Sequence, residues 1–246
     1  MARLNDIVEF CNAELDISTF DDYCPNGLQV EGRGEVRHVV SGVTASQALL
    51  DAAVVAGADL VVVHHGYFWR NEPAPLVGMK GRRIRTLYQA DMSLLAYHLP
   101  LDAHPQLGNN RQLGEQLGLS GGAPVSDLVW GCELARALPA DDLARRVEDV
   151  LGRAPLILGE RRPVSRVAWC TGAAQGYLAQ AAAAGFDAFI SGEVSEHTLH
   201  EAAELGILYI AAGHHATERY GVQALGREIA TRFEVEHQFI DVANPV

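Results

Sequence analysis

The stretch VVSGVTASQALLDAAVVAGADLVVV, residues 39–63, is repeated 128 positions later as VAWCTGAAQGYLAQAAAAGFDAFIS, residues 167–191. The two stretches align without a gap and share eight identical residues. Each has the pattern of a strand, an alanine-rich helix, a glycine that ends the helix, and a second strand. Because such β-α-β units favour parallel sheets covered by helices, the repeat predicts an α/β fold with internal duplication. We expect two pseudo-symmetric α/β lobes with largely parallel sheets.

A third apolar strand follows each repeat, and after it come a histidine and, four residues later, a carboxylate. These are residues 94–97 with His98 and Asp102, and residues 207–212 with His214 and Glu218. Helices are predicted to follow over residues 110–117 and 217–233. Ligands of parallel α/β sheets gather at the carboxyl ends of the strands, so both histidine–carboxylate pairs are candidates for a functional site.

The repeat also divides the chain into three predicted parts. They are a first α/β lobe at residues 1–120, a bridging element at residues 121–165, and a second α/β lobe at residues 166–246, together forming one compact unit. Within the bridging element we expect a strand over residues 133–138. A helix is expected over residues 142–151, capped at its start by Asp141 and stopped by Gly152.

The net charge limits the classes of molecule that the protein is expected to bind. The chain has 246 residues, and its 19 Lys and Arg residues face 31 Asp and Glu residues, a formal net charge of −12. A surface this acidic argues against a nucleic-acid partner, because binding to a phosphate backbone needs clustered Lys and Arg side chains. The sequence has no P-loop, no G-x-G-x-x-G motif and no G-x-S-x-G motif. The short basic run at residues 80–85 is expected to be the solvated start of a helix.

The spacing of the cysteines and the length of the apolar runs indicate in which cellular compartment the protein is expected. The four cysteines form no C-x-x-C pair, which excludes a zinc ribbon and argues against a disulfide scaffold. No signal-peptide pattern is visible, and no apolar run is long enough to cross a membrane. We therefore predict a cytoplasmic protein with no membrane partner.

His64 and His65 directly follow the apolar residues 60–63. Adjacent residues on a regular strand face opposite sides of the sheet, but where the backbone turns at a strand end both side chains can point into one crevice. Tyr67 and Phe68 are expected to form the wall of that crevice. The alternative is a pair of hydrogen-bonded histidines in the core or in a loop.

The candidate metal ligands offer three imidazole nitrogens and two carboxylates. They are His64, His65, Asp102, His214 and Glu218. This set is too large for one tetrahedral zinc with an open position, whereas two divalent metal ions bridged by a carboxylate and a water would use all of it. The ligand types suit zinc, iron or manganese and do not choose among them. The alternative is that these residues are helix caps and ion-pair partners.

His98 and Glu193 are the candidate catalytic residues. His98 is expected beside the metals, as a general acid–base or as a group that supports a ligand. Its alternative is a buried histidine bonded to the backbone near Pro100. Glu193 takes, through the repeat, the place of the His64–His65 pair, which suggests proton transfer or substrate contact. Its alternative is helix capping near Ser195. The remaining histidines of this segment, at positions 197 and 200, are expected at the surface.

Five ordered motifs resemble those of the GTP cyclohydrolase 1 type 2 homologs, also called Nif-three-like dinuclear metal centre proteins. They are Asn26-Gly-Leu-Gln-Val, Gly42-Val-Thr-Ala-Ser, Val63-His-His-Gly66, His98-Leu-Pro-Leu-Asp102 and Gly213-His-His-Ala-Thr-Glu218. The chain is similar to short bacterial members that lack the middle insert domain. The resemblance implies a toroidal homohexamer and metal ligands at the same five residues. Many relatives carry Tyr where this chain has His215, so His215 is not counted as a ligand.

Two functional hypotheses come from these observations. The first is a dinuclear metal-dependent hydrolase, in which a metal-activated water attacks a small nucleotide-like substrate. The family name implies ring opening of GTP, and it supports a metal hydrolase more strongly than it supports GTP. The second hypothesis is a metal-binding scaffold or metallochaperone that stores or delivers ions without turnover.

Overall fold

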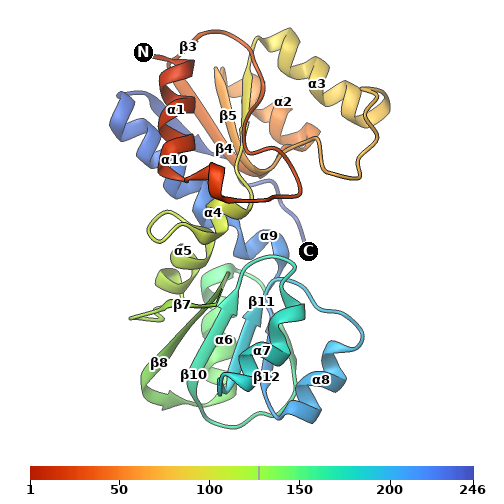
Figure 1. Cartoon of the computed structure of the whole chain (residues 1–246), viewed down its shortest axis with the longest axis vertical. Coiled ribbons are helices and arrows are strands. Elements are labelled where there is room, and N and C mark those ends of the chain that lie inside the picture. Colours follow the sequence, from red (N-terminus) through yellow and green to blue (C-terminus); the bar gives the residue numbers. More distant parts are fainter. Residues whose placement is uncertain (127) are drawn as a thin grey trace. The chain divides into compact units, whose positions relative to one another are not determined.

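The computed structural model describes residues 1–126 and 128–246, which divide into two compact units (Figure 1). Unit 1 consists of Met1–Leu107 and Gly221–Ala243, and unit 2 consists of Gly108–Tyr220 and Asn244–Val246. Each unit has its own mixed sheet with helices on both faces. The α/β class predicted from the repeat is therefore confirmed.

Unit 1 is built on a five-stranded sheet in the order β13-β4-β5-β6-β2. Its strands are β13 (Glu236–Phe239), β4 (His38–Thr44), β5 (Leu60–His65), β6 (Ser93–Ala96) and β2 (Gly27–Val30). The first four are parallel, and β2 pairs with β6 in the antiparallel direction. A separate two-stranded ribbon joins β1 (Ala2–Arg3) and β3 (Glu35–Val36).

Helices cover both faces of the unit 1 sheet. On one face, α1 (Leu4–Glu14) and α10 (Arg219–Phe233) lie side by side and bury Ile7 and Leu225 in a shared core (Figure 1). On the other face, α2 (Gln47–Ala56) and α3 (Gly78–Ala90) bury Leu50 and Leu87. Both cores are made of apolar side chains removed from water, which is the main source of the unit's stability.

Helix α2 shows how the sequence sets the boundaries of the repeated unit. Ser46 caps the helix, because its hydroxyl accepts a hydrogen bond from the Leu49 amide at 3.2 Å. Gly57 ends the helix in the left-handed conformation at φ 71°, which a glycine adopts without a steric penalty. The chain then enters β5 directly, so the helix and its two flanking parallel strands form a β-α-β unit.

Unit 2 is built on a six-stranded sheet in the order β7-β8-β10-β11-β12-β9. Its strands are β7 (Ala123–Ser126), β8 (Val129–Leu138), β10 (Val164–Cys170), β11 (Ala188–Ser191), β12 (Leu208–Ala211) and β9 (Leu156–Leu158). Helices α5 (Asn109–Gln116) and α6 (Ala140–Leu151) cover one face, and α7 (Leu178–Ala183) and α8 (Thr198–Leu205) cover the other. The short helix α9 (His214–Thr217) follows β12.

Among the described residues of unit 2, parallel pairing is limited to β10, β11 and β12. Strands β7, β8 and β9 join the sheet in the antiparallel direction. The prediction of largely parallel sheets is therefore too simple for this unit, and both sheets are mixed. The reason is that residues 121–165, predicted as a bridging element, supply all three antiparallel strands of the second sheet.

The central three strands of the two sheets pair in the same way. Val39 of β4 lies opposite Leu60, and Val167 of β10, which is 128 positions later, lies opposite Ala188. In both units the third parallel strand is added beside the second, as β6 and as β12. This shared register supports the repeat, and the duplication itself stays an interpretation of the sequence.

The two units are divided differently from the predicted parts 1–120, 121–165 and 166–246. Unit 1 is discontinuous in sequence and consists of residues 1–107 and 221–243. The second segment belongs to it because α10 completes its core and β13 pairs with β4. The predicted strand at residues 133–138 is the second part of β8. The predicted helix starts earlier, at Ala140, with Pro139 at its N-cap, so Asp141 lies inside the first turn and does not cap it.

Candidate metal centre

His64 and His65 are the last two residues of β5, so the strand runs two residues further than predicted. His64 is fully buried, and its Nδ1 lies 2.9 Å from the carbonyl oxygen of Tyr97. Because a carbonyl only accepts, Nδ1 carries the proton and donates it. In the neutral ring the lone pair is then on Nε2, which lies 3.5 Å from Asp102 Oδ1. A shared proton or a metal cation removes the conflict between these two acceptors.

His65 lies close to His64 although the two are neighbours on a strand. Their ring centroids are 4.6 Å apart, with the planes tilted by 49°. His65 Nδ1 is 3.1 Å from the hydroxyl of Thr44, on the adjacent strand β4. Asp102 comes from α4 (Leu99–Ala103), which begins directly after the β6 strand exit and leaves this carboxylate 7% exposed. The predicted meeting of His64, His65 and Asp102 at one strand edge is therefore present in unit 1.

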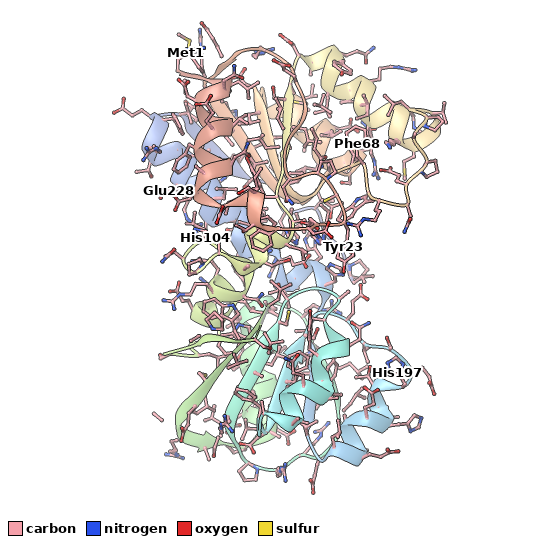
Figure 2. The ribbon with its side chains drawn as sticks, in the orientation of Figure 1. Met1, Tyr23, Phe68, His104, His197 and Glu228 are labelled. Carbon is pink, nitrogen blue, oxygen red and sulfur yellow. The ribbon has the colours of Figure 1, made fainter. Side chains whose placement is uncertain are left out.

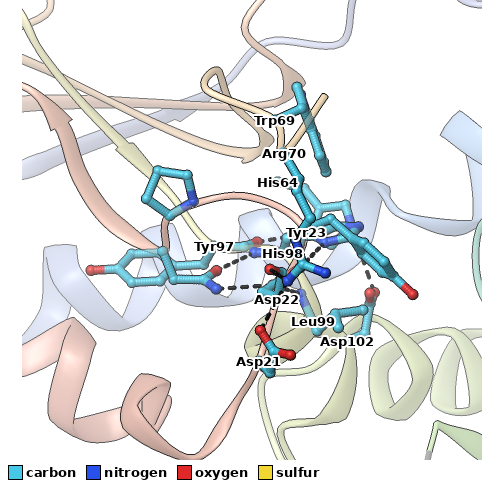
Figure 3. A network of polar contacts seen from close by, with 12 residues as sticks. Asp21, Asp22, Tyr23, His64, Trp69, Arg70, Tyr97, His98, Leu99 and Asp102 are labelled. Atoms are coloured by element: carbon cyan, nitrogen blue, oxygen red, sulfur yellow. Dashed lines mark hydrogen bonds and ion pairs between the residues drawn. The ribbon is translucent and has the colours of Figure 1, made fainter. Parts of the chain in front are cut away.

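His98 joins the same cluster from the exit of β6 (Figure 3). Its ring centroid lies 5.1 Å from that of His64 and 5.9 Å from that of His65. One ring nitrogen of each of these three histidines lies within 4.8 Å of the others. Unit 1 thus gathers three imidazoles and one carboxylate, a donor set that suits a divalent metal ion of intermediate softness.

His214 and Glu218 meet in unit 2 across one turn of chain around α9. His214 Nε2 lies 3.0 Å from Glu218 Oε2, and His214 Nδ1 lies 2.7 Å from Glu193 Oε1. Glu218 is 3% exposed. Burial lowers the pKa of His214, but the two carboxylates outweigh burial and raise the pKa to about 9. Without a metal, this imidazole therefore holds a proton at neutral pH.

Two glycines make room for the unit 2 cluster. Gly172, at φ 68°, follows β10, and a Cβ at this position would overlap Glu218 Oε1. Gly192 follows β11, and a Cβ there would lie 2.7 Å from the Cα of His214. The backbone therefore approaches the His214–Glu218 pair more closely than any residue with a side chain allows. We call this close backbone wall, formed at Gly172 and Gly192, the cradle.

Glu193 follows β11 at the position predicted from the repeat, and its carboxylate contacts His214 rather than capping a helix. This arrangement is typical of a carboxylate that orients a metal-binding histidine through its second ring nitrogen. His98 and His214 are not strictly equivalent. Counted from the matching sheet positions Ala96 and Ala211, His98 comes one residue earlier than His214.

The aromatic wall differs from the predicted one. Tyr67 is buried, and its hydroxyl donates to the carbonyl of Ala45, so it belongs to the core. Phe68 packs against Lys80, whose ammonium lies 4.7 Å from the ring centroid. Trp69 lies beside the histidines instead, with its centroid 5.0 Å from that of His98, and the ring centroid of Tyr23 lies 6.3 Å from that of His98. Sequence reasoning had no signal for choosing among three consecutive aromatic residues.

Other predicted features can be placed as well. Lys80 opens the basic run in α3 but is buried and paired with Glu72 at 3.2 Å, so the start of this helix is less solvated than predicted. His197 and His200 are exposed, as predicted. Figure 2 labels His197. The four cysteines are free thiols. Among the described residues, no helix is long and apolar enough to cross a membrane.

Comparison with known proteins places this chain in a family. The model of the Duf34/NIF3 (NGG1p interacting factor 3) family matches residues 2–245. The chain belongs to the Duf34/NIF3 family. A Pseudomonas aeruginosa relative named GTP cyclohydrolase 1 type 2 homolog is 59% identical over 98% of both chains. An Escherichia coli relative with the same name is 50% identical over 98% of both chains.

Two solved structures agree with the fold described above. The structure of the protein ybgI, described as of unknown function, matches with a TM-score of 0.95 and 48% identity over the whole of both chains. The structure of TTHA1606 from Thermus thermophilus matches with a TM-score of 0.91 and 35% identity, also over the whole of both chains. The family resemblance predicted from the five motifs is therefore confirmed.

The structure brings His64, His65 and Asp102 together in unit 1, with His98, and brings His214 and Glu218 together in unit 2, with Glu193. That the five predicted ligands serve one dinuclear centre stays a prediction. Asp22 and Thr44, which contact the histidines of unit 1, were missed because a single aspartate or threonine in a sequence carries no sign of its partner.

Proposed function

We propose that this chain is a dinuclear metal-dependent hydrolase that acts on a small, nucleotide-like substrate. The observation that carries the proposal is that each unit places a histidine nitrogen beside a buried carboxylate, at 3.5 Å in unit 1 and 3.0 Å in unit 2. The proposed ligand set is His64, His65, Asp102, His214 and Glu218. The name of the curated relatives, GTP cyclohydrolase 1 type 2 homolog, supports hydrolytic chemistry of this kind.

The donor sets fit two divalent ions. Neutral imidazole nitrogens together with carboxylate oxygens suit zinc, iron or manganese, and the sequence offers no thiolate among the proposed ligands. Close backbone approach at Gly172 and Gly192 leaves the space that the Glu218 carboxylate and the His214 imidazole occupy. When bound, such ions polarise an electrophile and lower the pKa of water.

The chain's own residues supply orientation and proton transfer. The carbonyl of Tyr97 holds His64, and the carboxylate of Glu193 holds His214, each through Nδ1, so both rings present Nε2 to the neighbouring carboxylate. His98, beside His64 and His65, is placed to move a proton to or from the reacting group. The geometry favours an orienting role for Glu193 over direct proton transfer.

GTP is one substrate to test. Ring opening at the purine C8 expels that carbon as formate, so formate release from GTP would assign the specific activity. The net charge of −12 opposes attraction of a triphosphate, and the sequence shows no phosphate-binding loop. Absence of formate with zinc, iron and manganese would remove GTP as substrate and leave the hydrolase class to other nucleotide-like compounds.

The assembly is a further part of this proposal. The family resemblance supports a homohexameric ring, and multi-angle light scattering tests it directly. A monomer across micromolar concentrations would refute the ring.

Elemental analysis of the purified protein, followed by a hydrolase substrate screen with the native metal restored, tests the proposed function. We expect about two ions per chain and turnover that is lost when His64 is replaced by Ala. Two readily exchanged ions without turnover of any substrate would instead support a metal-binding scaffold or metallochaperone.

A further inference from the structure

Asp22 sits at the centre of a polar network that reaches His98 (Figure 3). Its carboxylate accepts four N–H groups. Oδ1 accepts the Tyr23 amide at 2.6 Å and lies 2.7 Å from His98 Nδ1. Oδ2 accepts the Asn26 side-chain amide and the Leu99 backbone amide, both at 2.9 Å. The Asp22 side chain is 3% exposed, so its carboxylate is screened from water.

Four N–H donors use the whole acceptor capacity of a carboxylate, which has about four lone-pair directions. Burial raises the pKa of Asp22, but the bonds from His98 and Asn26 outweigh burial and lower the pKa to about 2. Asp22 is therefore ionised and fully engaged. Although Asp22, Cys24 and His98 lie close enough to hold a metal ion, binding one through Asp22 would break bonds that are already made.

The network determines which nitrogen of His98 carries a proton. Asp22 only accepts, so the nitrogen facing it, Nδ1, is the donor. In the neutral ring the lone pair is then on Nε2. Asn26 fixes the backbone of the same residue, because its Oδ1 accepts the His98 amide at 2.7 Å while its Nδ2 donates to Asp22. One carboxylate and one amide thus hold both the ring and the main chain of His98.

We propose that Asp22, supported by Asn26, is a positioning residue that fixes the Nδ1–H tautomer of His98 and presents Nε2 to the cluster of His64 and His65. The inference rests on the proposed function, in which His98 transfers a proton. It also assigns a role to the motif that begins at Asn26, which the metal ligands alone do not explain. Asp22 acts through His98 and needs no contact with the substrate.

Asp21 provides a matched control one residue away. Its carboxylate pairs with Arg70 at 2.9 Å, and its side chain is 93% exposed, so it faces solvent rather than His98. Asp21→Asn and Asp22→Asn make the same chemical change. In Asp22→Asn, however, the amide can turn only one oxygen toward the four donors, so its NH₂ faces N–H groups and the bond to His98 or the bond to Asn26 and Leu99 is lost.

The first measurement is the tautomer of His98 in zinc-loaded protein labelled with ¹⁵N-histidine. Magic-angle-spinning ¹⁵N spectra at pH 9, above the usual pKa range of imidazole, separate protonated from unprotonated ring nitrogens. The His98 signals are assigned by difference from His98→Gln. We expect Nδ1–H in the wild type and in Asp21→Asn, and a mixture of tautomers or Nε2–H in Asp22→Asn. A wild-type spectrum with Nε2–H, or an unchanged Asp22→Asn spectrum, overturns the inference.

The second measurement separates positioning from metal binding. With p-nitrophenyl phosphate as the probe, we expect Asp22→Asn to keep its metal content and lower kcat about 100-fold, with KM within about threefold of the wild type. Asp22→Glu should recover part of the loss, and Asp21→Asn should behave as the wild type. Loss of metal in Asp22→Asn, or equal losses at both aspartates, would reject the positioning role.

The two measurements distinguish a failure of the proposed function from a failure of the positioning role of Asp22. If the wild type holds metal but hydrolyses neither this probe nor other substrates, the proposed function loses support, while the tautomer still decides whether Asp22 fixes His98. If Asp22→Asn does not fold, the wild-type tautomer and the Asp22→Glu variant carry the test.

Discussion

The histidine–carboxylate clusters of the two units differ in what holds the histidine. In unit 1 the fully buried His64 donates through Nδ1 to a backbone carbonyl, that of Tyr97. In unit 2 the corresponding nitrogen of His214 faces the carboxylate of Glu193, and the ring lies between two negative charges. Unit 1 thus orients His64 through a backbone carbonyl, whereas unit 2 orients His214 through a side chain that also changes the electrostatics.

This difference teaches that similar strand exits can hold a histidine beside a buried carboxylate in different ways. At the matching positions, unit 1 carries the His64–His65 pair at the end of β5, and unit 2 carries Gly192 and Glu193 directly after β11. Unit 1 supplies more nitrogen and unit 2 more negative charge. A metal ion entering the unit 2 cluster must therefore displace a proton from His214, whose pKa is raised to about 9.

The largest effect is expected from removing the negative charge of unit 2. Glu218→Gln should lower the metal content from about two ions per chain to less than one, because a neutral amide replaces a buried anion proposed to lie between two cations. His64→Ala and His65→Ala should each leave about one ion, since each removes a ligand of one ion only. Elemental analysis of all three variants measures this. Full metal content in His64→Ala would contradict the two-metal model.

A smaller effect is expected at the group that orients His214. Glu193→Gln should weaken metal binding about 10–100-fold, which is the usual cost of losing a carboxylate behind a metal-bound histidine. Competition with a chromogenic chelator gives the affinity. Glu196→Gln is the matched control, because this exposed carboxylate pairs with the exposed His200, at 3.5 Å. Equal affinities of Glu193→Gln and the wild type would show that unit 2 does not depend on this carboxylate.

The cradle around Glu218 offers a sharper test of packing. Gly172→Ala should lower the free energy of unfolding by at least about 1–2 kcal/mol, because alanine is strained at positive φ and its Cβ overlaps Glu218. Gly176→Ala, at a nearby glycine where a Cβ would face open space, should change stability by less than about 0.5 kcal/mol. Chemical denaturation of the metal-free proteins compares the two. Similar losses at both glycines would argue against the cradle.

The pH dependence of the metal-free protein gives the smallest expected effect. The folded-state pKa of His214 lies above its usual value of 6.5, so the stabilisation is complete below pH 6.5 and is lost as the pH rises through about 9. The screened loss should be about 1–2 kcal/mol, because the side chain is one-quarter exposed. Denaturation at pH 6 and pH 9.5, with His214→Gln as control, measures it. The variant should lack this decrease.

Much of the fold was predictable because the repeat has a clear helical and strand period. The strands around residues 60–63 and 94–97 and the helix between the repeated strands appear where the sequence places them, within a few residues. The antiparallel strands β7 and β9 were not predictable, since they are short and have little apolar alternation. The return of β13 to β4 was also missed, because strand pairing between distant segments leaves no local signal.

The site was predictable to the level of residue type and strand exit. His64, His65 and Asp102 meet as expected, because the carboxyl ends of neighbouring parallel strands lie at one sheet edge. The orienting partners were not predictable. Tyr97 acts through its backbone carbonyl, which every residue has, and Asp22 reaches His98 from a segment 76 residues earlier in the sequence.

The discontinuity of unit 1 has a consequence for synthesis on the ribosome. Val222, Leu225 and Ile229 of α10 complete the core of unit 1, and β13 covers the edge of β4, yet these three residues and β13 are translated only after residues 108–220. Until then the nascent chain exposes the apolar side chains of α1 and an unpaired edge of β4. The N-terminal half of this chain is therefore synthesised first but completes its fold last.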